Sequence, residues 1–167
     1  MTFNPELDLQ FERIVDVPRE KIWAAWTTPK LLMPWFCPLP WKTVACEIDL
    51  RAGGTFSFTM QSPQGQQFPN LACYLEVIPN EKLVWTNALD LGFRPAKLPE
   101  SSPGHECEEF AMTAMILLEA VAGGTKYTAH VMHATKEACA QHEKMGFKDG
   151  WETCLDQLVA IIKKGVK

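Results

Sequence analysis

The hydrophobic pattern is clearest near the C-terminal end of the chain. Counting from Trp151, apolar residues recur at offsets of three, four, seven, eight and eleven, at Cys154, Leu155, Leu158, Val159 and Ile162. This spacing marks one face of a 3.6-residue helix. Polar residues occupy the opposite face, so the pattern predicts an amphipathic helix from about Asp149 to Lys163. Its apolar face either packs on the core as an ordinary helix does, or in part roofs a ligand cavity around Trp151.

Most of the remaining chain alternates between apolar and polar residues with a period of two, which is typical of half-buried strands. Turn residues, among them Gly53-Gly54 and Gly123-Gly124, separate the alternating segments. Short strands joined by tight turns predict an antiparallel meander. The predicted strands are Leu9–Val17, Val44–Leu50, Thr55–Met60, Leu71–Ile78, Leu83–Thr86, Phe110–Leu118 and Thr125–Met132.

Two short helices are predicted after the first strand. Pro18 suits the first position of a helix that continues over Arg19–Trp26, because its missing N–H is not needed there. A second segment, Lys30–Trp35, is ended by nearby prolines. Near the C-terminus, Thr135 is a predicted N-cap, and the glycines at 146 and 150 predict a break before the amphipathic helix.

The segment from Ala88 to Glu108 is irregular and rich in proline and glycine. A connection of this length inside a compact domain is usually functional or mobile. Because it contains Leu89, Leu91, Phe93 and Leu98, we expect a flap that lies on the protein.

This order of elements predicts an α+β, helix-grip fold. A curved antiparallel sheet of six to seven strands would wrap around the long C-terminal helix, with two short helices after strand 1. Residues 1–167 are expected to form a single domain. A helix gripped by a curved sheet leaves a cavity, which is the usual place for a small molecule.

Composition narrows the function classes. The chain is 47% hydrophobic and 22% charged, which is typical of a folded globular protein. A net charge of -4 offers no general attraction for nucleic acid or anionic lipid. We find no basic, apolar leader at the N-terminus and no unbroken apolar stretch long enough for a bilayer, so we expect a cytoplasmic protein with neither nucleic acid nor membrane as partner. The six cysteines are expected to be thiols, because no C-x-x-C pair occurs.

Four stretches together resemble a known family: FERIVDVPREKIWAAWTTPKLLMPWF, EIDLRAGGTFSF, EVIPNEKLVWT and HEKMGFKDGWETCLDQL. They are similar to the C-terminal domain of the activator of heat-shock-protein-90 ATPase, in the START-like, birch-pollen-allergen-like (SRPBCC) superfamily. The resemblance covers Phe11 to about Ile162. It implies a helix-grip fold with a deep pocket, and many stand-alone members have no known ligand.

The candidate pocket wall is made mainly of large apolar and aromatic side chains, which give shape and stacking rather than catalysis. The same side chains would equally serve to fill a core, since strand parity alone does not say which face is concave. The candidate ligand-binding residues are Trp35, Trp41, Phe56, Phe58, Tyr74, Trp85, Phe110, Met112, His130, Met132, Trp151 and Leu155.

Polar candidates are few. His130 and His133 lie on the last strand with opposite side-chain directions, so only one can face the cavity. Such a histidine near Glu47 or Asp49 would suit proton transfer, although a structural histidine is the commoner case.

The other polar candidates point less directly to a binding or catalytic site than the histidines do. Arg51 either binds a carboxylate or, as we favour, pairs with an acid at its turn. Pairs with metal-like spacing, Cys139 with His142 and His105 with Cys107, lack the four ligands that zinc requires. We expect no metal, no cofactor and no dedicated catalytic residue.

The leading hypothesis is therefore a stand-alone START-like domain that binds a small, largely apolar molecule between the sheet and the C-terminal helix. One alternative is an enzyme of the same fold that uses a cavity histidine and a carboxylate for proton transfer. The other is a co-chaperone-like interaction module, although we do not expect a chaperone partner because the sequence shows no additional N-terminal domain. A homodimer is compatible with this fold but is not argued by the sequence.

Overall fold

The computed structural model describes residues 2–97 and 110–165. Seven strands form one antiparallel sheet in the order β1-β9-β8-β5-β4-β3-β2. Their bounds are β1 Asp8–Val15, β2 Lys42–Ile48, β3 Thr55–Gln61, β4 Gln67–Ile78, β5 Lys82–Thr86, β8 Met112–Val121 and β9 Gly124–His133. A two-residue pair, β6 Leu89–Asp90 and β7 Arg94–Pro95, forms a separate small ladder around the 3₁₀ turn η1 Leu91–Phe93.

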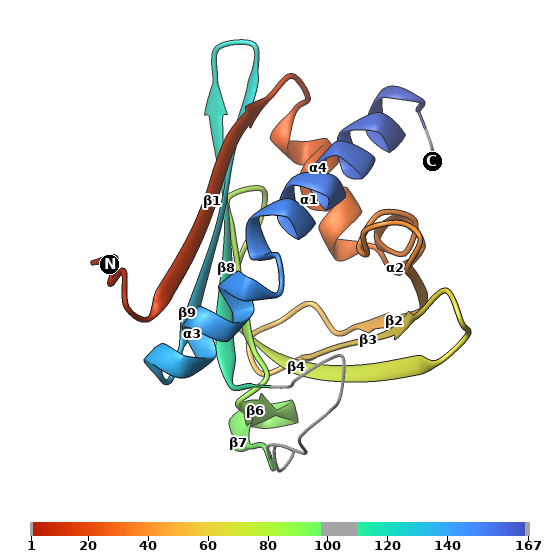
Figure 1. Cartoon of the computed structure of the whole chain (residues 1–167). Helices are drawn as coiled ribbons and strands as arrows, with labels where there is room; N and C mark the ends of the chain where they lie inside the picture. The colour runs from red at the N-terminus through yellow and green to blue at the C-terminus, as the bar shows by residue number, and fades with distance from the viewer. Residues whose placement is uncertain (1, 98–109, 166–167) are drawn as a thin grey trace.

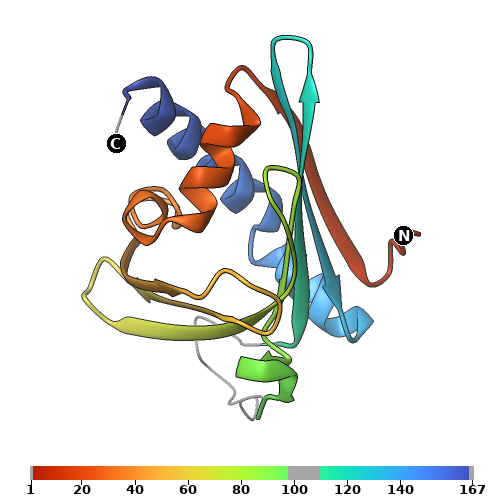
Figure 2. The ribbon, with the colours of Figure 1, turned by 180° about the vertical axis from the view of Figure 1, so that it is seen from behind.

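The helices lie on one side of this sheet, inside its curve (Figure 1). They are α1 Arg19–Thr27, α2 Pro29–Leu32, α3 Lys136–Lys144 and α4 Phe147–Lys163. Figure 2 shows β2, β3 and β4 running across beneath α1 and α2, while β1, β8 and β9 stand steeply beside α4. The predicted α+β fold, with a curved antiparallel sheet around a C-terminal helix, is confirmed.

Strand register separates an inner face, toward the helices, from an outer face. Arg13 of β1 donates a hydrogen bond to Asp156 of α4 at 2.7 Å, so the odd-numbered residues of β1 point inward. Arg13 is the partner of Tyr127, and this pairing extends the inner face across β9 and onward strand by strand. The inner face therefore carries buried apolar residues on most strands, including Phe11, Phe56, Tyr74, Leu83, Trp85, Ile116, Tyr127 and Val131.

Helix α4 has the amphipathic pattern that its sequence predicts. Phe147, Cys154, Leu155 and Leu158 are buried on its sheet-facing side. The helix begins at Phe147, two residues earlier than expected, and runs through Gly150 without a break. The break lies at Gly146, whose φ of 94° is a left-handed conformation that glycine adopts at little cost.

Gln157 fastens α4 to the loop that follows α2. Its amide nitrogen donates to the carbonyls of Trp35 at 3.0 Å and Cys37 at 2.8 Å, and its amide oxygen accepts from the Leu39 N–H at 3.0 Å. This single polar side chain satisfies three backbone groups that the irregular loop leaves without secondary-structure partners. The loop is thereby held against the helix.

Several element boundaries differ from the prediction by a few residues, as the ends of helices and strands often do. Pro18 is the N-cap of α1 rather than its first helical residue, and α2 is a single turn. Thr135 is the predicted N-cap of α3 and accepts a hydrogen bond from the Ala138 N–H at 3.1 Å.

The predicted flap is only partly described, because residues 98–109 lie outside the described part of the chain. Leu91 and Phe93 are 56% and 49% exposed, so these two apolar residues cover the protein less than expected. A Cβ added at Gly53 would come within 3.0 Å of the Phe93 ring, which shows how closely this segment lies against the β2–β3 turn.

Candidate functional site

A contiguous group of rings fills the space between the inner face and the helices. We call Trp26, Trp35, Phe36, Phe56, Tyr74 and Trp85 the aromatic cluster. Trp26 of α1 is its centre, with ring centroids 4.9 Å from Trp35, 5.3 Å from Phe36 and 5.3 Å from Trp85. Helix α1 contributes Trp26, the loop after α2 contributes Trp35 and Phe36, and strands β3, β4 and β5 contribute one member each. The cluster is a packed core that occupies much of the expected deep cavity.

A pocket lies beside this cluster. Its volume is about 240 Å³, and we call it the inner pocket. It lies between the inner face of β3, β4, β5 and β8 and the described part of the flap. Its lining residues are Phe58, Pro69, Asn70, Leu71, Ala72, Trp85, Asn87, Asp90, Ala96, Lys97 and Met112. Its floor is apolar, since Phe58, Trp85 and Met112 belong to the inner face, while Asp90 and Lys97 supply charges at its flap side.

A larger hollow of about 440 Å³ lies elsewhere, on β2, β3 and β4. Most of its lining, including Ala45, Glu47, Ser57 and Thr59, has the outer-face parity. It therefore does not lie between the sheet and the helices. The inner pocket does lie on the inner face, but the flap lines it rather than α4, so its position differs from the predicted one between the sheet and the C-terminal helix.

The structure places the predicted wall residues in four groups. Phe58, Trp85 and Met112 line the inner pocket. Trp35, Phe56, Tyr74, Trp151 and Leu155 belong to the core around the aromatic cluster. Trp41 packs against Phe68 of β4 with ring centroids 5.5 Å apart, and Phe110 packs against His133 and His142.

His130 and Met132 form the fourth group and differ from the expectation. They pair with Gln10 and Asp8 of β1, on the outer face of the sheet. Side chains on this face point away from α4, so neither residue lines the space between sheet and helix. His133, which follows Met132 on β9, is the histidine that faces inward.

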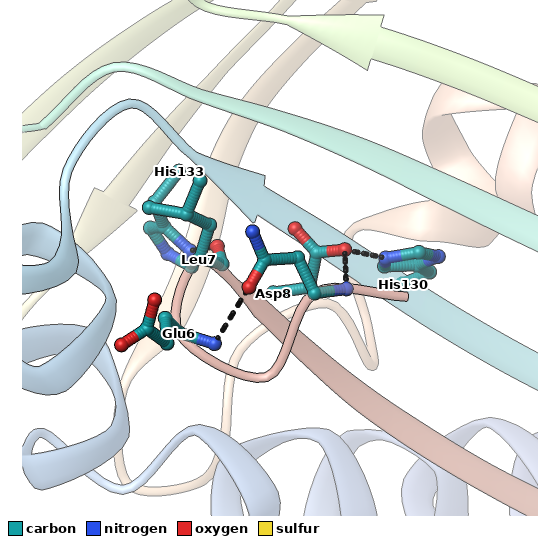
Figure 3. Close-up of polar contacts among 6 residues, drawn as sticks. Glu6, Leu7, Asp8, His130 and His133 are labelled. Atoms are coloured by element: carbon teal, nitrogen blue, oxygen red, sulfur yellow. Dashed lines mark hydrogen bonds and ion pairs between the residues drawn. The ribbon is translucent and has the colours of Figure 1, made fainter. Parts of the chain in front are cut away.

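His130 instead forms a buried pair with Asp8, shown in Figure 3. Its Nε2 lies 3.0 Å from Asp8 Oδ2, and the two side chains are 9% and 8% exposed. The same carboxylate oxygen accepts a hydrogen bond from the Asn4 N–H at 2.9 Å. The pair therefore fixes the N-terminal segment to β9.

The expected pairing of a histidine with Glu47 or Asp49 does not form. Glu47 lies on β2 and Asp49 follows it, whereas His130 and His133 lie on β9, separated by four intervening strands. Asp49 is engaged by Arg51 at 2.8 Å, which confirms the ion pair favoured for that turn. Neither carboxylate proposed for proton transfer therefore lies beside a histidine of β9.

His133 forms a different pair, with His142 of α3. His133 Nε2 and His142 Nδ1 are 2.9 Å apart, and His133 Nδ1 lies 3.0 Å from the Leu7 carbonyl oxygen. A carbonyl only accepts, so His133 donates from Nδ1 and accepts at Nε2, and His142 donates from Nδ1. The neutral His142 ring then carries its lone pair on Nε2.

Burial, and secondarily the neighbouring His133, lowers the pKa of His142 to about 4. Three rings surround it, with centroids at 4.9 Å for Phe110, 5.1 Å for His133 and 5.2 Å for Phe147. An apolar cage of this kind disfavours the charged imidazolium. His142 is therefore neutral at ordinary pH, and its hydrogen bond with His133 joins α3 to β9.

The cysteine thiols carry no obvious reactivity. Cys46, Cys73, Cys139 and Cys154 are free thiols, as predicted, while Cys37 Sγ lies 3.2 Å from the Thr43 hydroxyl and Cys107 lies outside the described residues. Burial raises the pKa of Cys46 to about 11 and, with Cys37 as a lesser cause, that of Cys154 to about 12. Nucleophilic chemistry needs the thiolate, which such values suppress.

Within residues 2–97 and 110–165, no three His, Cys, Asp or Glu side chains come together as a metal-binding group. The predicted pair His105 and Cys107 lies outside these residues. The other pair, Cys139 and His142, shares helix α3. In the same described part of the chain, no helix is both long and apolar enough to cross a membrane.

Sequence reasoning missed several pocket and cluster residues. The Phe36 ring centroid lies 5.7 Å from that of Phe56 and 4.9 Å from that of Phe58. Phe36 belongs to an irregular loop, so no hydrophobic periodicity in the sequence identifies it. Ala72 lines the inner pocket because its side chain is small. Alternation from Tyr74 would have placed Ala72 on the same face, so that signal was present in the sequence.

A seven-stranded antiparallel sheet curved around a C-terminal helix, with two short helices after the first strand, defines the helix-grip, START-like class. Within that class, the model of the family "Activator of Hsp90 ATPase homolog 1-like protein" matches residues 16–163. This match spans most of the chain, so the chain belongs to that family.

Solved structures agree with this assignment. A protein from Nitrosomonas europaea is 42% identical, with a TM-score of 0.88 and 98% of each chain covered. A protein from Rhodobacter sphaeroides is 21% identical, with a TM-score of 0.78 and 96% of each chain covered. An AHSA1-like protein from Aeromonas hydrophila, at 18% identity and a TM-score of 0.70 over 96% of each chain, shares the fold. A comparison with curated proteins finds no match.

Proposed function

We propose that this chain binds a small, largely apolar molecule in the inner pocket. The observation that carries the proposal is the position of that pocket. It opens on the inner face of the sheet, against Trp85 of the aromatic cluster, with Phe58 and Met112 beside it. Pockets with apolar walls and a few polar groups are the common form of small-molecule sites.

The size of the pocket limits the ligand. Its volume of about 240 Å³ is below the usual range for drug-sized ligands, roughly 300–1,000 Å³. An engineered apolar cavity of about 150 Å³ is enough for benzene. A molecule of one or two rings, or an aliphatic chain of similar bulk, fits this space.

Native mass spectrometry of the purified protein, with solvent extraction and identification of any bound compound, is the first test. A panel of one- and two-ring apolar compounds would then be screened by thermal unfolding. A ligand at 100 times its Kd should raise Tm by about 5 °C or more. A panel that yields neither a co-purified compound nor a shift would refute the proposal.

A pocket-filling variant makes the screen specific. Ala96 lines the inner pocket from the flap side, so Ala96→Trp should occupy the space and remove the ligand-induced shift. Ala122, exposed in the β8–β9 turn, provides the matched control. Ala122→Trp adds the same side chain away from the pocket and should leave the shift intact. Equal shifts in both variants would place binding elsewhere.

A second candidate function is a protein-interaction module of the co-chaperone kind. The family's name favours it, as do the exposed apolar side chains of Leu91 and Phe93. Exposed apolar residues that lie together are typical of interaction sites. Binding to a purified chaperone, measured by titration calorimetry, would support this function if Leu91→Ser and Phe93→Ser weakened it. Unchanged binding in those variants would contradict it.

The remaining expectations stay predictions. A cytoplasmic location would be tested by cell fractionation, and a homodimer by sedimentation of the purified chain. The proposed ligand binding depends on neither the location nor the oligomeric state.

A further inference from the structure

Polar atoms without partners lie inside the aromatic cluster. The indole nitrogens of Trp26 and Trp35 and the hydroxyl of Tyr74 are buried and have no hydrogen-bond partner. The residues themselves are at most 1% exposed. Buried donors of this kind are rare in folded proteins, because each has lost its hydrogen bonds to water without replacement. A ligand that brings an acceptor atom into the cluster would satisfy these donors.

Trp26 differs from the other two residues because the Tyr127 hydroxyl lies near its side chain. Its side chain lies close enough to Tyr127 to lower the pKa of that hydroxyl, against the larger effect of burial, which raises it. Trp26 therefore has a polar neighbour even though no hydrogen bond closes. The proposal below therefore rests on the Trp35 indole and the Tyr74 hydroxyl.

Tyr74 adjoins the inner pocket. It is the cross-strand partner of Trp85 and lies two residues from Ala72 on the same face of β4, and both of these neighbours line the pocket. Its ring stacks on Phe56 with centroids 5.5 Å apart. Tyr74 is thus a direct neighbour of two pocket-lining residues, although it does not line the pocket itself.

Trp35 lies one ring farther into the cluster. Phe36 separates it from the sheet, with centroids 5.6 Å from Trp35 and 5.7 Å from Phe56. An indole N–H only donates, and a tyrosine hydroxyl donates or accepts. Both groups are therefore satisfied by a ligand that brings acceptor atoms, and a pure hydrocarbon satisfies neither.

We propose that the ligand is a small aromatic or alicyclic molecule with an uncharged acceptor, such as a ketone or ester carbonyl, which enters the aromatic cluster and accepts from the Tyr74 hydroxyl and the Trp35 indole. This inference rests on the proposed function and names its ligand class. Acceptors that carry a full charge do not fit, because the cluster offers no cation to accompany them.

The test compares two probes of nearly equal shape, acetophenone and α-methylstyrene, which differ by a carbonyl oxygen in place of a methylene group. The measured quantity is the ratio of their Kd values, obtained by titration against wild-type protein and against Tyr74→Phe. Removing the hydroxyl should shift this ratio about fivefold against the ketone. Trp35→Phe should shift it in the same direction.

Tyr127→Phe is the matched control, since it removes another buried hydroxyl from the inner face, on β9. Its Kd ratio should equal that of the wild type. A second readout is the Tm of ligand-free Tyr74→Phe, which should equal or exceed the wild-type value because the hydroxyl has no partner to lose.

The outcomes separate the two proposals. If both probes bind and Tyr74→Phe leaves the ratio unchanged, the acceptor inference is wrong while the proposed function stands. A lower Tm for Tyr74→Phe together with an unchanged ratio would assign the hydroxyl to a buried water and also overturn the inference. Failure of both probes to bind the wild-type protein would overturn the acceptor inference, whereas the proposed function is decided by the compound panel and the search for a co-purified ligand.

Discussion

The pair formed by His133 and His142 makes the stability of this protein depend on pH. The perturbation we consider is His142→Asn, since the asparagine amide retains an N–H donor near the position of Nδ1 but does not titrate. His133 then keeps a hydrogen-bond donor at its Nε2. The variant therefore isolates the proton-binding property of His142 from its contact with β9.

The sign follows from the pKa of His142, which is about 4 in the folded protein against the ordinary value of 6.5 for a histidine side chain. Between these values the unfolded chain binds the proton and the folded protein does not. Stability therefore rises with pH across this window. It is fully present above pH 6.5, falls as pH drops, and is lost below pH 4.

The magnitude follows from the same two values. A shift of this size corresponds to roughly 3 kcal/mol at most, and partial solvent access of the ring reduces it to about 2 kcal/mol between pH 7 and pH 4.5. The groups that face His142 are His133 from β9 and the rings of Phe110 and Phe147, with Glu143 beside it on α3. These side chains are the same in the wild type and the variant, so the two proteins differ only at position 142.

The assay is urea unfolding at pH 7 and at pH 4.5. The wild-type free energy of unfolding should fall by about 2 kcal/mol more than that of His142→Asn across this interval. Gln141→Asn, on the same helix, is the control and should follow the wild type. Equal pH dependence in the wild type and His142→Asn would refute the reasoning, because His142 would then bind a proton equally in both states.

Three further changes test other parts of the structure by the same assay at pH 7. Gly54→Ala should destabilise by roughly 3 kcal/mol, since its Cβ would lie 2.0 Å from the Asp49 carbonyl oxygen, and a neutral result would show that the β2–β3 turn relaxes freely. Gly150→Ala should instead stabilise α4 by about 1 kcal/mol, because only a Pro38 side-chain atom comes within 4.0 Å of the added Cβ, and a loss of stability would contradict that geometry. Gln157→Leu should cost about 2–3 kcal/mol, as three backbone groups lose their partner, and a cost below about 0.5 kcal/mol would mean that water replaces the side chain.

Local sequence signals were sufficient for the elements and the class of fold. The spacing of Cys154, Leu155 and Leu158 identified the face of α4 that is buried, and alternation placed Phe56 and Phe58 together on one face of β3. These patterns are set within one element, by helical or strand periodicity, so no knowledge of distant contacts was needed. The resemblance to a known family then supplied the order of the layers.

The candidate site needed more than local pattern. Alternation separates His130 from His133 but does not say which one faces the helices, and that depends on how β9 pairs with β1. The partner of His130 proved to be Asp8, from the opposite end of the chain, rather than Glu47 or Asp49. Pairing across the sheet is a long-range property that one strand's sequence does not encode.

By itself the sequence determined the strands, the amphipathic helix and the family, because periodicity and turn chemistry act over a few residues. Only the tertiary structure decided that most of the predicted cavity wall is packed core, and that a pocket of about 240 Å³ remains beside Trp85. It also left the buried hydroxyl of Tyr74, whose cross-strand partner Trp85 lines that pocket, without a hydrogen-bond partner. The physical reason is that free volume and unsatisfied donors are properties of many side chains packed together, so they exist only once the layers have met.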